Sequence, residues 1–130
     1  MILDTGFVID VMKGEPAALE RQRLFAEEKT QYSVAAATIF ELWVGIALSR
    51  KSDEEKGKVK NALSELVTVR LSGPIAQKAG EIHGSLIKQG GGIGLMDSMI
   101  AATALLANEP VLTRNAKHFS KVKGLLVESY

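Results

Sequence analysis

The chain contains no cysteine, which excludes disulfide bonds and a zinc site built on thiolates. The absence of cysteine is typical of proteins from the reducing cytosol, so we expect a cytoplasmic protein. No uninterrupted apolar run reaches the length that crosses a membrane, because Glu, Arg or Asp interrupts the longest apolar segments. No basic segment followed by an apolar one precedes Ile2, so we expect neither a secretory signal nor an association with a membrane.

Excess charge and aromatic side chains are also scarce. The 16 Lys and Arg residues nearly balance the 15 Asp and Glu residues, so the whole molecule exerts no strong field on nucleic acid. Aromatic residues make up 5% of the chain, too few near the candidate site to form an evident stacking platform for RNA bases. A local excess of positive charge occurs in residues 114–123, where Arg114, Lys117, Lys121 and Lys123 occur without an acid. This basic segment is a weak indication of phosphate contact.

The remaining composition is that of a soluble globular protein, with 46% hydrophobic and 24% charged residues, and we expect residues 1–130 to form one domain. Short apolar runs that end in turn residues predict strands at 2–3, 31–34, 67–69, 111–113 and 125–127. Apolar residues at helical spacing predict helices at 6–13, 16–28, 37–50, 53–66, 74–88 and 97–107, and residues 116–119 are expected to form a short turn or helix. Strands that alternate with helices predict an α/β fold with a parallel sheet covered on both faces.

The segment 37–50 is apolar on two sides. Spacings of three and four residues predict one buried face formed by Ile39, Leu42, Trp43 and Ile46. Steps of four residues form a second stripe of Phe40, Val44 and Leu48. We expect the sheet to cover one side, and a second helix or a second copy of the chain to cover the other.

Three acidic residues occur where strands end or helices begin. Asp4 follows the first strand, Glu41 lies in the first turn of the helix predicted for 37–50, and Asp97 begins the helix predicted for 97–107. Each also has a structural explanation: an Asx turn for Asp4, a capping box of Thr38 and Glu41, and an N-cap for Asp97. Yet an acid in as apolar a segment as that around Glu41 is expected to be paired or used.

Polar residues follow the late strand as well. Thr113 and Asn115 come directly after it, and His118 precedes Phe119; an Asx turn or helix cap explains Asn115, and a backbone hydrogen bond explains His118. In a parallel sheet, all of these positions lie at the edge where open α/β sheets bind their ligands. Three carboxylates gathered there repel, and at about 5 Å each pair costs roughly 3 kcal/mol. A divalent cation that prefers oxygen ligands, Mg²⁺ or Mn²⁺, would offset this repulsion and activate water for phosphodiester cleavage.

Four segments together resemble one known family. They are Ile2–Gly6, Glu41-Leu42 followed by Gly45, the block from Leu95 to Ala104, and Leu112–Asn115. They resemble the PIN domain, and most closely the VapC-type toxins of prokaryotic toxin–antitoxin pairs. The resemblance extends over nearly the whole chain.

The resemblance implies a three-layer α/β/α sandwich with a central parallel sheet and a Mg²⁺- or Mn²⁺-dependent ribonuclease. It implies that Asp4, Glu41 and Asp97 are the metal ligands and, with Asn115, the catalytic residues. Thr5 and Thr113 would be supporting polar groups that orient ligands or water. The resemblance also implies a homodimer and a protein antitoxin that covers the groove.

One position departs from the family pattern, because many members have a fourth acid where this chain has His118. A histidine does not supply the same anionic oxygen, so we expect weaker occupancy of a second metal site. The leading hypothesis is an endoribonuclease in which Arg114, Lys117 and Lys121 hold flanking phosphates of the RNA substrate. The alternative is a catalytically weak module with the same fold that binds RNA or a protein partner. A third hypothesis, a phosphoacceptor domain with Asp4 as nucleophile, has no other support in the sequence.

Overall fold

The computed structural model describes residues 1–130. Its five strands are β1 (Ile2–Leu3), β2 (Ser33–Ala35), β3 (Val67–Val69), β4 (Val111–Leu112) and β5 (Val127–Glu128). Its helices are α1 (Thr5–Lys13), α2 (Pro16–Arg23), the 3₁₀ helix η1 (Leu24–Ala26), α3 (Ala36–Leu48), α4 (Ser52–Leu63), α5 (Gly73–Lys88), α6 (Leu95–Ala107) and α7 (Ala116–Phe119). The strands form one sheet in the order β3-β2-β1-β4-β5, and every neighbouring pair is parallel. The predicted parallel sheet is therefore confirmed.

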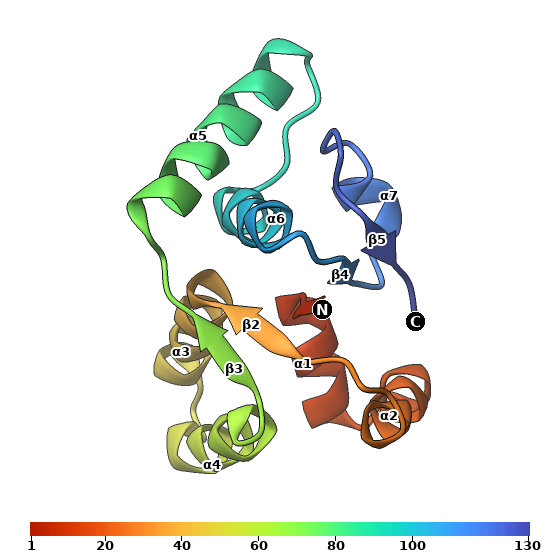
Figure 1. Cartoon of the computed structure of the whole chain (residues 1–130). Coiled ribbons are helices and arrows are strands. Elements are labelled where there is room, and N and C mark those ends of the chain that lie inside the picture. The colour runs from red at the N-terminus through yellow and green to blue at the C-terminus, as the bar shows by residue number, and fades with distance from the viewer.

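Neighbouring residues of the central strands face opposite sides of the sheet, as the two-residue period of a strand requires. Ile2 and Val111 are paired in register and belong to the core beneath α5 and α6. Leu3 and Leu112 are the next pair and belong to the core shared with α1, α3 and α4. Figure 1 shows the two layers, with α5 and α6 on one side of the strands and α1, α2 and α4 on the other. This is the three-layer sandwich that the resemblance implied.

Local sequence signals explain where several helices begin and end. Helix α1 ends at Gly14, whose φ of 77° is the left-handed conformation that glycine adopts without strain. Helix α5 begins after Ser72, whose hydroxyl accepts a hydrogen bond from the backbone N–H of Ile75 at 3.3 Å. Four apolar residues at helical spacing then bury the predicted face of α5: Ile75, Ala79, Ile82 and Leu86.

Two helix starts differ from the sequence prediction. Helix α3 begins at Ala36 with Ala35 as its N-cap, so Thr38 is inside the helix and the predicted capping box is wrong. Consecutive alanines have high helix propensity and extend the helix toward the strand. Helix α6 begins at Leu95 with Gly94 as its N-cap, so Asp97 lies within the first turn and is not the cap. Glu41 and Asp97 therefore have no capping role that would explain them.

The helix predicted for 16–28 is also shorter than expected, because α2 ends at Arg23 and η1 follows it. The second strand begins at Ser33 rather than residue 31. None of the helices has both the length and the apolar character that crossing a membrane requires.

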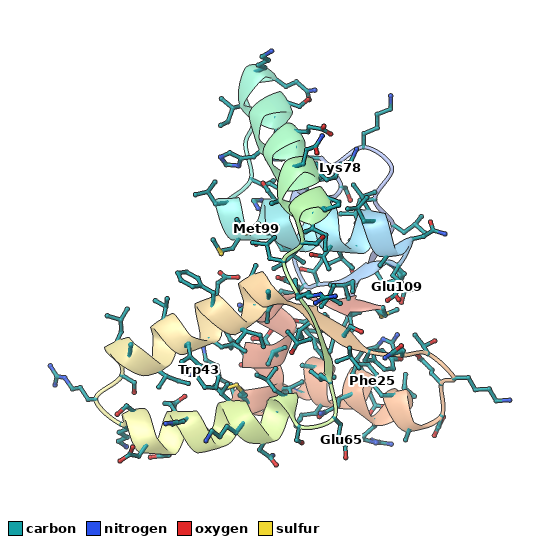
Figure 2. The ribbon with its side chains drawn as sticks, turned by 60° about the vertical axis from the view of Figure 1, so that its left-hand side comes forward. Phe25, Trp43, Glu65, Lys78, Met99 and Glu109 are labelled. Carbon is teal, nitrogen blue, oxygen red and sulfur yellow. The ribbon has the colours of Figure 1, made fainter.

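The two predicted faces of α3 have different surroundings. Leu42 and Ile46 are buried, but Trp43 is 39% exposed, so its predicted burial is wrong. Figure 2 shows Trp43 on the side of α3 toward α4. The second stripe is open to solvent, since Phe40 is 60% and Leu48 81% exposed. No part of this chain covers that stripe.

Candidate active site

Asp4 connects the central strand to the first helix. It follows β1 directly and is the N-cap residue of α1, but its side chain makes no capping hydrogen bond. Instead the carboxylate accepts a hydrogen bond from the hydroxyl of Thr113, which follows the neighbouring strand β4, at 2.7 Å. Asp4 is 8% exposed and Thr113 is fully buried. The first strand and its neighbour thus fix one carboxylate at the carboxyl edge of the sheet.

Glu41 is joined to the same edge through Thr5. The hydroxyl of Thr5 donates to Glu41 Oε1 at 2.7 Å and lies 3.0 Å from the hydroxyl of Thr38. Thr5 has one hydroxyl hydrogen, which the charged Glu41 receives, so Thr38 donates to Thr5. Thr38 is fully buried within α3, and the bond across to α1 explains its polar side chain there. The supporting position predicted for Thr5 therefore corresponds to a direct contact with Glu41.

Asp97 contributes the third carboxylate, from the first turn of α6. Its Oδ2 lies 2.9 Å from Nε2 of His118, which belongs to α7. His118, the residue that departs from the family pattern, therefore contacts one of the three predicted acids directly. Both side chains are partly exposed, at 30% for Asp97 and 26% for His118, so the pair lies at the surface of the site.

The three carboxylates interact electrostatically. Burial raises the pKa of the Asp4 carboxyl, the Thr113 hydrogen bond lowers it, and the negative charge of Asp97 raises it. Burial likewise raises the pKa of Glu41, the hydrogen bond from Thr5 opposes this, and the charges of Asp97 and Asp4 add to the increase. Neither Asp4 nor Glu41 has a Lys or Arg partner. Asp4 and Glu41 are thus two neighbouring carboxylates that no ion pair neutralises directly.

The oxygen donors are those that Mg²⁺ and Mn²⁺ prefer, and the repulsion among them favours a cation. However, no group of three or more His, Cys, Asp or Glu side chains is arranged to hold a metal ion. The sequence predicted that three carboxylates meet around one ion, and the side chains do not form that arrangement. Thr5 and His118 each bind one oxygen of Glu41 and Asp97, and the second oxygen of each carboxylate makes no hydrogen bond within the chain.

The two remaining predicted residues lie beside Thr113. The backbone N–H of Asn115 donates to the Thr113 hydroxyl at 3.0 Å, while the Asn115 side chain is exposed and does not cap α7. Arg114 donates to Asp10 and is exposed over most of its side chain. All eight residues predicted for the site are thus linked at one edge of the molecule by hydrogen bonds, charge or direct succession in the chain.

Two residues near the site were missed in the sequence. Asp10 is 3% exposed and accepts hydrogen bonds from Arg114 and from the hydroxyl of Tyr130, at 2.8 Å for the latter. Burial, followed by the hydrogen bond to Asp10, raises the pKa of Tyr130. Asp10 was detectable, because an acid between Ile9 and Val11 requires a partner just as Glu41 does. Nothing in the sequence indicates Tyr130.

The protein thus has a parallel sheet with three interacting acids at its carboxyl edge, and comparison with known proteins identifies the class of protein that has this arrangement. The family described as the PIN domain matches residues 1–125. The chain belongs to the PIN domain family.

Its relatives within that family are VapC ribonucleases. The chain is 27% identical to the tRNA(fMet)-specific endonuclease VapC of Shigella flexneri, over 99% of this chain and 96% of that protein. It is 30% identical to Ribonuclease VapC2 of Haemophilus influenzae, with the same coverage. The structure of VapBC2 from Rickettsia felis, bound to a promoter DNA fragment, matches with a TM-score of 0.90 and 25% identity, over 99% of this chain and 97% of that one. The resemblance inferred from the sequence is confirmed.

Proposed function

We propose that this chain is a Mg²⁺- or Mn²⁺-dependent endoribonuclease and the toxin of a toxin–antitoxin pair in the cytoplasm. Its membership of the PIN domain family and its VapC ribonuclease relatives support the reaction class. One observation within the chain carries the proposal: acids from three separate elements gather at one edge of the sheet, where the charge of Asp97 raises the pKa of Asp4 and the charges of Asp97 and Asp4 raise that of Glu41. No lysine or arginine forms an ion pair with Asp4 or Glu41, whereas carboxylates with a purely structural role would be expected to form one.

Asp4, Glu41 and Asp97 would hold the cation. When bound, it supplies a Lewis acid that stabilises the negative charge developing at the scissile phosphate. Thr113 fixes the orientation of Asp4, and Thr5 fixes that of Glu41. The exposed amide of Asn115 is free to hold a water molecule or a phosphate oxygen. Second-sphere hydrogen bonds of this kind typically change metal affinity or activity by about 10–100-fold.

The RNA substrate would be held by its phosphates. Arg114 and Lys117 are exposed where the chain leaves β4 and enters α7, next to the carboxyl edge of the sheet. Lys121 is exposed as well, but it lines a separate groove with Lys78 of α5 and Leu105 of α6. Binding through phosphates depends on salt and carries little sequence information, in line with the small number of aromatic residues near the site.

We further propose that a protein antitoxin covers the entrance to the site. A groove of about 450 Å³ extends from Glu41 between α1, α3 and α4, and it combines apolar and charged lining residues: Ile9, Met12, Lys13, Leu42, Gly45, Ser49, Glu55 and Lys58. The matched structures from Rickettsia felis and Salmonella typhimurium are VapBC complexes, which supports a protein partner. The exposed stripe of Phe40, Val44 and Leu48 would be the homodimer contact.

The test is cleavage of a panel of structured RNAs by the purified protein in Mg²⁺, in Mn²⁺ and in EDTA. We expect cleavage only with a divalent cation, and a loss on the order of 100-fold or more for Asp4→Asn and for Asp97→Asn. Asp53→Asn, an exposed acid in the first turn of α4, is the matched control and should retain full activity. Unchanged cleavage by both site variants would refute the proposed chemistry.

The contact between His118 and Asp97 favours one alternative, a catalytically weak module that binds RNA or a protein partner. In this alternative the histidine occupies an oxygen of Asp97 that an ion would use. His118→Asp discriminates between the two functions. A large gain of cleavage over the wild-type protein would favour the weak module, whereas comparable cleavage by both proteins would favour the ribonuclease.

A further inference from the structure

We propose that Asp10 and Tyr130 position Arg114 as a phosphate-binding side chain at the rim of the candidate active site. This inference rests on the proposed function, because it assigns to the RNA substrate one defined contact. Asp10 and Tyr130 would not touch the substrate themselves.

The buried carboxylate of Asp10 is the fixed point of this cluster. Both of its oxygens accept hydrogen bonds from Nη1 of Arg114, at 2.7 and 2.8 Å, and Oδ2 also accepts one from the hydroxyl of Tyr130 at 2.8 Å. A buried carboxylate is tolerated when it is paired and hydrogen-bonded in this way. Asp10 thereby fixes the orientation of a guanidinium that belongs to another element.

Arg114 keeps most of its donors free. Its side chain is 59% exposed, and Asp10 uses only one of its three nitrogens. The N–H groups of Nε and Nη2 make no hydrogen bond within the chain, and the planar guanidinium holds them side by side. This arrangement matches two oxygens of a phosphate group, and holding it in advance reduces the entropy lost on binding.

Gly6 shows that the free side of Arg114 is next to Asp4. A Cβ atom at Gly6 would lie 3.3 Å from Asp4 Oδ2 and 3.8 Å from Arg114 Nε. The guanidinium and the carboxylate therefore flank the same glycine. A phosphate held by Arg114 would lie beside the carboxylate proposed to hold the metal.

Tyr130 is the last residue of the chain and is held against the first helix. Its ring packs edge-on against Phe7, with ring centroids 4.8 Å apart and an interplanar angle of 82°. The ring contact places the hydroxyl at Asp10, where it is the only donor other than Arg114. We infer that this hydroxyl keeps the carboxylate in the plane that orients Arg114.

A purely structural ion pair, joining α1 to the loop after β4, makes a different prediction. Removing the negative charge of Asp10 makes the protein more positive, and charge alone would then strengthen RNA binding. If Asp10 instead positions Arg114, the same substitution weakens RNA binding. The sign of the change separates the two explanations.

The experiment measures binding of a fluorescein-labelled, mixed-sequence 20-nucleotide RNA by anisotropy, in EDTA and over a series of salt concentrations. We expect Arg114→Gln to reduce the slope of log affinity against log salt by about 0.7, the value for one phosphate contact to a single strand. We expect Asp10→Asn and Tyr130→Phe to weaken binding by about threefold to tenfold. Glu15→Gln, an exposed acid with no ion pair, removes the same charge as Asp10→Asn and should bind at least as tightly as wild type.

Equal affinities for Asp10→Asn and Glu15→Gln would overturn the inference, as would an unchanged salt slope for Arg114→Gln. If Asp10→Asn fails to fold, Tyr130→Phe decides the matter, because it keeps the ring and the net charge. Binding in EDTA is independent of cleavage. A wild-type protein that cleaves no RNA would refute the proposed function, whereas normal cleavage with unaltered binding by Tyr130→Phe would refute only the positioning role.

Discussion

Thr113→Val removes one hydroxyl and tests how Asp4 is held. Thr113 is fully buried, and its hydroxyl both donates to Asp4 at 2.7 Å and accepts from the backbone N–H of Asn115 at 3.0 Å. Valine has nearly the same shape, so no cavity forms and the substitution changes mainly hydrogen bonding. We therefore expect the fold to persist with lower stability and lower activity.

The loss of stability follows from the two bonds. A hydrogen bond to a charged group contributes about 1.5–3 kcal/mol, and the second bond adds less because water reaches the exposed Asn115. The expected decrease in the free energy of unfolding is about 2–3 kcal/mol. For a chain of this size, this corresponds to a fall in Tm of roughly 8–12 °C. Loss of a group that orients a metal ligand should also reduce cleavage by about 10–100-fold.

The effect on stability depends on pH in a defined direction. The pKa of Asp4 in the folded protein is already raised by burial, and without the Thr113 hydroxyl it rises further. The ionised carboxyl is then less favourable in the folded chain than in wild type, so the destabilisation is fully present above the folded pKa of the variant. It shrinks as pH falls from the folded pKa of the variant to that of the wild type, and it is absent below both values, because Asp4 is then protonated in both folded proteins and the unfolded pKa is the same for the two.

Thr103→Val is the matched control for this prediction. Thr103 is also buried, but its hydroxyl donates to the backbone carbonyl of Met99 within α6 and contacts no carboxylate. We expect a loss below about 1 kcal/mol, no added pH dependence and no change in cleavage. Thermal unfolding of both variants across the acid range is the measurement. Equal stability of Thr113→Val and wild type at pH 8 would refute the role assigned to the Thr113 hydroxyl.

Two further substitutions test the dimer contact and the approach to Asp4. Leu48→Glu should shift a dimer toward the monomer in sedimentation velocity, because Leu48 is 81% exposed on the apolar stripe. Leu126→Glu is the control, since Leu126 is 63% exposed but lies outside the stripe, and it should leave the dimer intact. Equal sedimentation of both variants would contradict the assigned contact. Gly6→Ala should reduce cleavage at least tenfold with Tm little changed, because its Cβ would lie 3.3 Å from Asp4 Oδ2. Gly84→Ala, where an added Cβ meets nothing within 4 Å, should raise stability by about 0.5–1 kcal/mol and leave cleavage intact.

The sequence predicted most elements because their signals are local. The apolar pair before Asp4, the β-branched run at 67–69 and the glycine after Lys13 each define an element without help from the rest of the chain. The four apolar residues of α5 follow one helical face and are all buried. Helix starts were less predictable, because the hydroxyl of Thr38 bonds Thr5 across two helices rather than capping its own.

Burial on α3 shows a different limit of the sequence. Leu42 and Trp43 are both apolar residues at helical spacing, yet only Leu42 is buried. Periodicity identifies an apolar surface but not what lies against it, because a face covered by a second molecule has the same pattern as one covered by the sheet. For the same reason the homodimer stays a prediction. The assignment of residues 1–130 to a single domain also stays a prediction.

The sequence by itself determined the class of the protein and the polar residues that meet at the carboxyl edge of its sheet, because strand-ending acids and hydroxyls are local features and a parallel sheet brings strand ends together. Only the tertiary structure decided which groups contact one another. It joined His118 to Asp97, and it made the last residue, Tyr130, a partner of Asp10. Those contacts join residues 21 and 120 positions apart in the chain, and no local pattern specifies a pairing set by the packing of whole elements.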